Sequence, residues 1–273
     1  MTGTGATTLD RIAAIARRDA RVQLSYHFQL VTRNASLVFV LFTYFFIGRL
    51  VTDTDALAPY GGGYFDFALV GLIVTTFAVV AMSAFSATIT SEQQSGTLEI
   101  LLASAVPLPT LLAGSLVVPT VLAAGQALVL GGVGWAVSGG GIGLQGVLLA
   151  LPLLLLTFGT FCALGIVSAA LIVLTKRGDI WSGVVLQLSS LVAGAVFPVS
   201  VLPAPLQLIA RLFPAFYGFE GLRGVLLSGQ GLTDVLDELV ILAAFNVVMF
   251  PAALWVFGRA LRVARVTGTL GND

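Results

Sequence analysis

Residues 146–175 read GVLLALPLLLLTFGTFCALGIVSAALIVLT, a stretch that contains no charged side chain. A helix needs about 20 residues to cross the hydrocarbon core of a bilayer, so this stretch is long enough to span it. Because backbone amides have no water to bond to inside lipid, each crossing is expected to be helical. The stretch therefore predicts a transmembrane helix and, with it, an integral membrane protein.

Five further apolar segments of comparable length lie on either side of this stretch: 34–52, 65–88, 109–137, 180–202 and 238–258. Together they predict an all-α polytopic membrane protein with six transmembrane helices, forming a single transmembrane domain over residues 1–273. The composition agrees, because 58% of the residues are hydrophobic and only 10% are charged. Soluble domains carry about 25% charged residues, which this chain lacks.

Residues 8–33 have a different, amphipathic pattern. Leu9, Ile12 and Ala16 recur at helical spacing, while Arg17 and Arg18 supply a charged side. Such a helix is expected to lie in the membrane interface, with its arginines toward lipid head groups. A solvated N-terminal arm is the alternative.

Basic residues are unevenly distributed over the two sides of the predicted bundle. Cytoplasmic loops of membrane proteins are enriched in lysine and arginine, and this bias indicates orientation. Both termini are therefore predicted to be cytoplasmic, in a multi-pass protein of the cell inner (plasma) membrane. The cytoplasmic set is Arg11, Arg17, Arg18, Arg21, Arg33, Lys176, Arg177, Arg259, Arg262 and Arg265, and the external set is Arg49, Arg211 and Arg223.

The sequence lacks the residues that several kinds of catalytic and metal site require. Its single lysine, Lys176, does not stand in the G-x-x-x-x-G-K-[ST] loop by which many ATPases hold phosphate. One histidine, His27, provides neither a histidine-pair zinc site nor an evident catalytic triad. A formal net charge of zero gives no electrostatic support for a nucleic-acid partner. We expect a non-catalytic chain without a metal or cofactor of its own; a membrane-embedded enzyme or scaffold is a weaker alternative.

The predicted span interiors are almost free of charge. Gln126, Gln187 and Asn246 are their polar side chains of note, and buried acids are missing. Ion-coupled carriers usually place ionisable groups or broken helices around an ion site. An ion-coupled secondary transporter therefore stays as the alternative, and an external energy source is favoured. The uncharged interior favours a hydrophobic or amphipathic cargo.

The cytoplasmic connection 89–108 contains the run SEQQSGTLEILL from Ser91 to Leu102. Thr97 is a plausible N-cap, and Glu99 falls in the first turn, where the helix dipole favours an anion. The pattern predicts a short helix, apolar toward the bundle and polar toward the cytoplasm, that suits docking of a soluble partner; an ordinary amphipathic connector is the alternative. Its candidate residues are Glu92, Gln93, Gly96, Thr97, Leu98, Glu99, Leu101 and Leu102.

The external stretch 203–237 is the longest connection. Pro203 and Pro214 bracket a helix of about ten residues, too short to span the membrane, which is expected to enter or cap the outer leaflet as a re-entrant element. Glu220 and Arg223 are three residues apart and are spaced to pair on a following helix. The motif residues are Pro198, Leu202, Pro203, Pro214, Glu220 and Arg223.

At these two runs the chain resembles the membrane subunits of type-2 ABC exporters, which include drug-resistance and polysaccharide-export permeases. The first run matches Glu…Gly-Thr-Leu-Glu-x-Leu-Leu after the second span, and the second matches Pro-x-x-x-Leu-Pro…Pro…Glu-x-x-Arg after the fifth. Two places depart from the family pattern. Ala105 replaces a common proline, and Gly114 and Ser115 replace a common basic residue.

The resemblance implies roles for both runs. Glu92 to Leu102 would form the coupling helix that meets a separate nucleotide-binding ATPase subunit, in which ATP and magnesium would bind. The region 203–237 would close the outer gate. The expected assembly contains two permease copies, as a homodimer or heterodimer, and exports a drug, a lipid-like molecule or a polysaccharide.

Overall fold

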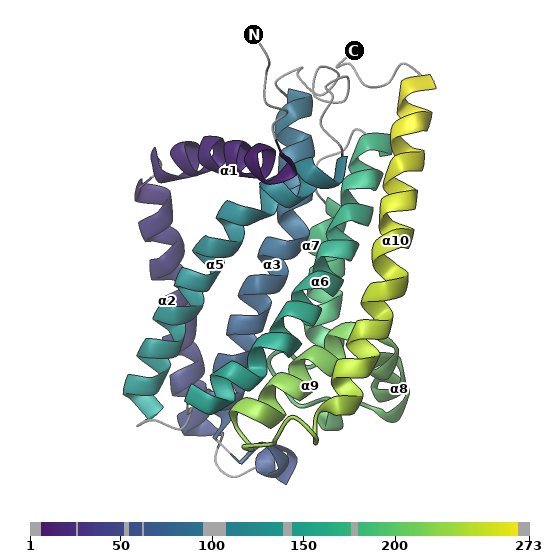
Figure 1. Ribbon diagram of the computed structural model, residues 1–273. Coiled ribbons are helices and arrows are strands. Elements are labelled where there is room, and N and C mark those ends of the chain that lie inside the picture. The colour runs from purple at the N-terminus through teal and green to yellow at the C-terminus, as the bar shows by residue number, and fades with distance from the viewer. Residues whose placement is uncertain are drawn as a thin grey trace.

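The computed structural model describes residues 7–25, 27–51, 55–61, 63–94, 108–138, 144–175 and 180–266. Every element within these residues is helical, which confirms the all-α prediction (Figure 1). The elements are α1 (Thr8–Ser25), α2 (His27–Leu50), η1 (Asp55–Tyr60), α3 (Tyr64–Gln94), α5 (Leu108–Ser138), α6 (Leu144–Thr175), α7 (Ile180–Val192), η2 (Val199–Val201), α8 (Ala204–Leu212), α9 (Pro214–Leu226) and α10 (Leu236–Val266).

Four helices are long and apolar enough to cross a membrane: α3, α5, α6 and α10. Their apolar parts start and end close to the predicted spans. The apolar parts of α2 and α7 are shorter, at Asn34–Leu50 and Ser182–Val192. The chain is a multi-pass membrane protein, and six crossings remain a prediction.

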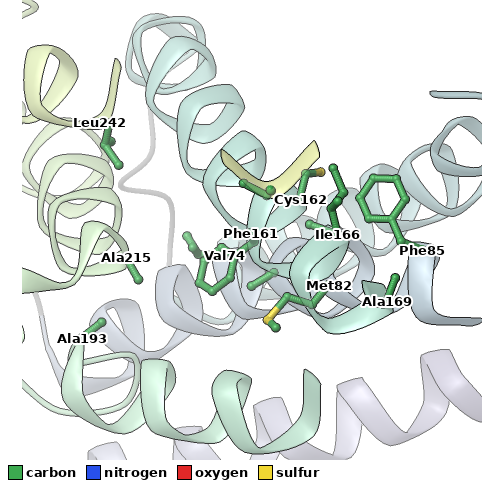
Figure 2. Close-up of a cluster of buried hydrophobic side chains, with 14 of the residues drawn as sticks. Val74, Met82, Phe85, Phe161, Cys162, Ile166, Ala169, Ala193, Ala215 and Leu242 are labelled. Atoms are coloured by element: carbon green, nitrogen blue, oxygen red, sulfur yellow. The ribbon is translucent and has the colours of Figure 1, made fainter. Parts of the chain in front are cut away.

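Helix α3 is the centre of the bundle. In the most apolar part of α3, 72% of the residues are buried, whereas the corresponding fraction in α10 is 11%. Gly165 of α6 lies so close to α3 that a Cβ there would be 2.8 Å from the carbonyl oxygens of Ala81 and Met82. Around this crossing the core joins α3, α6, α9, α10 and the residue after α7, as Figure 2 shows with Val74, Met82, Phe85, Phe161, Cys162, Ile166, Ala169, Ala193, Ala215 and Leu242.

Helix α1 lies across one end of the bundle rather than along it (Figure 1). Ile15 packs on Gly114 of α5, where a Cβ would come within 2.9 Å of the isoleucine side chain. This contact gives a packing reason for a glycine at position 114. The predicted helix 8–33 is divided, because α1 ends at Ser25 and α2 starts at His27.

Helix α7 ends at Val192, before the end of the predicted span 180–202. Gly194 adopts a left-handed backbone with φ of 78°, a conformation that favours glycine. The amides of Ala193 and Ala195 donate to the carbonyls of Ser189 and Ser190, which closes the helix end in the manner of a Schellman cap. The chain then turns into η2 and α8, so α7 is shorter than the predicted span.

Helix α10 continues to Val266, beyond the predicted end of the span at residue 258. Its last turns are amphipathic: Ala260 and Ala264 are buried, while Arg259 and Arg262 are exposed. The Arg259 guanidinium lies 5.0 Å from the centroid of the Trp255 ring. The helix outlasts the apolar segment because its inner face still packs on the bundle.

Candidate functional site

The prolines and leucine of the second motif lie at the ends of short helices, at the end of the bundle opposite α1 (Figure 1). Pro198 and Leu202 flank η2, Pro203 is the N-cap of α8, and Pro214 is the first residue of α9. Proline suits the first turn of a helix because its missing N–H would have no partner there. Gln207 of α8 donates through Nε2 to the Leu202 carbonyl over 2.8 Å, which ties α8 back to η2.

Arg223 of α9 is fully buried at this end of the bundle. Its Nη1 donates to the Gly194 carbonyl and its Nη2 to the Ala195 carbonyl, each over 2.7 Å, and Nη2 also lies 3.5 Å from the Phe67 carbonyl. The guanidinium carbon sits 3.5 Å from the centroid of the Phe67 ring. One side chain of α9 thus binds the end of α7 and the start of α3 together.

The electrostatics of this position favour a cation. The carbonyl oxygens of Gly194 and Ala195 lie in the turn after α7, and buried backbone carbonyls need a hydrogen-bond donor. Burial lowers the pKa of the Arg223 guanidinium to about 10, and the nearby Glu220 and Tyr60 act in the opposite direction. The group is therefore charged at neutral pH, and it donates to the carbonyls of the turn that follows α7.

Glu220, one turn before Arg223 on α9, binds a different partner. The Tyr60 hydroxyl lies 2.8 and 2.9 Å from the two carboxylate oxygens of Glu220 and donates to them. Burial raises the pKa of the Glu220 carboxyl, while the hydrogen bond from Tyr60 and the charge of Arg223 act against that rise. Burial likewise raises the pKa of the Tyr60 phenol. We refer to Tyr60, Phe67, Gly194, Ala195, Glu220 and Arg223 as the Arg223 cluster.

Sequence spacing placed Glu220 and Arg223 next to each other, and the structure does so too, but with separate hydrogen-bond partners. The roles of Tyr60 and of the Gly194–Ala195 turn were not anticipated. Tyr60 is 160 residues from Glu220 along the chain. The local sequence offers only that Tyr60 directly precedes a run of three glycines at positions 61–63.

The Arg223 cluster also joins the connection before α3 to the connection after α9. The distribution of basic residues predicts both connections on the same side of the membrane. Besides the Tyr60–Glu220 bond, the Ser228 hydroxyl donates to the Pro59 carbonyl over 2.9 Å. Pro59 belongs to η1, and Ser228 follows α9. The connections before α3 and after α9 therefore close the same end of the bundle.

A second feature is the exposed face of α7. It carries the apolar residues Val184, Leu188 and Leu191 together with Gln187, whose side chain is also exposed. By contrast, the exposed side chains in the central parts of α5, α6 and α10 are apolar or glycine. An amide facing hydrocarbon without a partner costs about 1–3 kcal/mol, so this face of α7 is poorly suited to lipid.

Two of the predicted docking residues lie at the other end of α3. The helix runs through Glu92 and Gln93 and ends at Gln94. Gly96, Thr97, Leu98, Glu99, Leu101 and Leu102 lie outside the described residues, and their role stays a prediction. Among the residues that the structure describes, no group of three or more His, Cys, Asp or Glu side chains is arranged to hold a metal ion.

Comparison with known proteins identifies the family. Residues 12–227 match the ABC-2 type transporter family, and this range includes α2 through α9. A stretch of 138 residues is 30% identical to Nodulation protein J of Rhizobium leguminosarum bv. trifolii, covering 45% of this chain and 52% of the relative. The matched stretch thus spans about half the length of that relative. The chain belongs to the ABC-2 type transporter family.

Proposed function

We propose that the chain is the membrane-spanning permease subunit of an ATP-driven exporter in the inner (plasma) membrane. It crosses the bilayer six times, has both termini in the cytoplasm and works with a second permease copy. A separate ATPase subunit binds ATP and magnesium and supplies the energy. The interfacial position of α1 against lipid head groups belongs to the same proposal.

The observation that carries this proposal is the path of α3. Its first turns hold Phe67, whose ring and carbonyl meet Arg223, and it continues as one helix to Gln94, where the predicted docking segment begins. It is also the most buried of the four long apolar helices. A continuous, packed helix can transmit a displacement from its end at Gln94 to the Arg223 cluster at its other end.

The exposed face of α7 supports a place for the cargo path. Gln187 lies among apolar residues on a surface poorly suited to lipid. We place this face toward the second permease copy, lining the route between the two copies. A mixed apolar and amide surface fits the predicted amphipathic or hydrophobic cargo, a drug, a lipid-like molecule or a polysaccharide.

The ATPase partnership is tested by affinity purification from native membranes. The wild-type chain should co-purify with a nucleotide-hydrolysing subunit, and replacing Glu92 and Glu99 by glutamine should abolish that association. Asp237→Asn serves as the control, because this exposed acid lies at the start of α10, at the opposite end of the bundle.

The result that overturns the proposal is a purified chain that moves cargo without nucleotide and loses transport on addition of an ionophore. Such behaviour would establish an ion-coupled carrier instead.

A further inference from the structure

The turn after α7 is held by a side chain of another helix, α9. The carbonyl groups of Gly194 and Ala195, in the turn directly after α7, accept hydrogen bonds from Arg223, which comes from α9. The intervening turn rests on α3 at Gly71, where a Cβ would lie 2.9 Å from Nη2 of Arg223 and would overlap the Ala195 carbonyl. The guanidinium is therefore enclosed between three elements.

The alternatives to this bond are poor. With the guanidinium removed, two buried carbonyls lose their donors, and no water reaches a fully buried position easily. Lysine is not equivalent, since its ammonium is a point charge, whereas the planar guanidinium bonds two carbonyls at once and stacks on Phe67.

We propose that Arg223 is a positioning residue that fastens α7 to α9, so that the two helices move as one body during the transport cycle. The inference rests on the proposed export function, because it gives α7 a face on the cargo path. Through Arg223, movement of the external helices would carry the face of α7 that bears Gln187. Glu220 and Tyr60 hold the same segment of α9 to η1 and complete the fastening.

The test measures distances between spin labels in the complex with its ATPase. Cysteines at Leu188 on α7 and Tyr217 on α9 carry one label pair, and cysteines at Leu188 and Val248 on α10 carry the other, in a Cys162→Ala background. Leu188 and Val248 are exposed, and Tyr217 is partly exposed. Distances are compared between the nucleotide-free complex and the complex trapped with ATP and vanadate.

In the chain with Arg223 intact, the α7–α9 distance should change by less than about 2 Å between the two states. A change of more than about 5 Å would overturn the inference, because the helices would then move independently. This arm needs no substitution at position 223, so it decides the matter even where Arg223 variants fail to fold.

The second arm compares Arg223→Met, Arg223→Lys and the matched charge removal Arg211→Met, on the exposed side of α8. Arg223→Met should broaden the α7–α9 distance distribution, Arg223→Lys should restore it in part, and Arg211→Met should leave it unchanged. An unchanged distribution in Arg223→Met would overturn the inference. Failure of the wild-type complex to respond to ATP would instead refute the proposed function, while the resting-state comparison would still test the fastening.

Discussion

Gly71 of α3 lies directly against the carbonyl of Ala195, with no room for a methyl group between them. The contact places the turn after α7 on the central helix and presents its carbonyls to Arg223. Gly71→Ala forces backbone to move, and we expect it to lower stability by about 1–3 kcal/mol. Thermal unfolding in detergent measures the loss.

The matched control is Gly125→Ala on α5, where an added Cβ meets nothing within 4 Å. There we expect no loss, or a gain of up to about 1 kcal/mol from helix propensity. Equal effects at the two positions would contradict the contact between Gly71 and Ala195.

Tyr60→Phe removes the hydroxyl that donates to Glu220 while keeping the ring that packs 4.9 Å from Phe67. Leaving a half-buried carboxylate without this donor should cost about 1–3 kcal/mol of stability. Tyr217→Phe is the control, since its hydroxyl donates to the Arg211 carbonyl at an exposed site. A smaller loss in Tyr60→Phe than in Tyr217→Phe would speak against the Tyr60–Glu220 bond.

Glu220→Gln should flatten the dependence of stability on pH. Because burial raises the pKa of the Glu220 carboxyl above its ordinary value of 4.5, the folded state binds that proton more tightly than the unfolded state. The stability this provides is present below the ordinary pKa and is lost as the pH rises through the folded-state value. Unfolding midpoints over a pH series test this, and identical profiles for wild type and variant would contradict it.

Asn246 of α10 forms hydrogen bonds to α6 in the apolar part of both helices. Its Nδ2 donates to the Leu156 carbonyl over 2.9 Å and to the Thr160 hydroxyl over 3.0 Å. Interhelical hydrogen bonds in membranes contribute about 1 kcal/mol, so Asn246→Ala should lower stability by about that amount. The neighbouring Val247 is exposed, so Val247→Ala is the control. An equal loss of stability in that variant would show that the Asn246 hydrogen bonds are not stabilising.

The variant Gln187→Leu distinguishes two positions for the exposed face of α7: toward lipid or toward the cargo path. If the amide faced lipid, leucine would stabilise the protein by about 1–3 kcal/mol and leave transport intact. We expect the reverse: little change in the unfolding midpoint and a several-fold change in export rate. Val248→Leu, on the exposed face of α10, should alter neither.

Hydropathy predicted the helices that are apolar throughout. The segments 65–88, 109–137 and 146–175 reappear as α3, α5 and α6, because length and lack of charge are sufficient for a membrane helix. It did not predict the end of α7. Residues after Val192 remain apolar, and the break comes from the left-handed backbone of Gly194, which hydropathy does not record.

The motif residues were recognised, but their partners were not. Spacing along one helix suggested that Glu220 and Arg223 pair with each other, whereas Arg223 binds carbonyls 28 and 29 residues away and Glu220 binds Tyr60. The carbonyls of Gly194 and Ala195 are available to Arg223 because the chain leaves α7 in this turn, and this depends on tertiary structure. Sequence spacing therefore identified the residues of the cluster without its geometry.

The claim on which the transport cycle depends is that the segment after α3 faces the cytoplasm while the Arg223 cluster faces outward. A membrane-impermeant thiol reagent tests this in a Cys162→Ala background, with one cysteine at Thr97 or at Gln230, an exposed residue before α10. The Thr97→Cys variant should react in inverted vesicles and not in intact cells, and the Gln230→Cys variant should show the opposite pattern. Labelling of the Thr97→Cys variant in intact cells would place the docking segment out of reach of any cytoplasmic ATPase and would contradict the proposed mechanism.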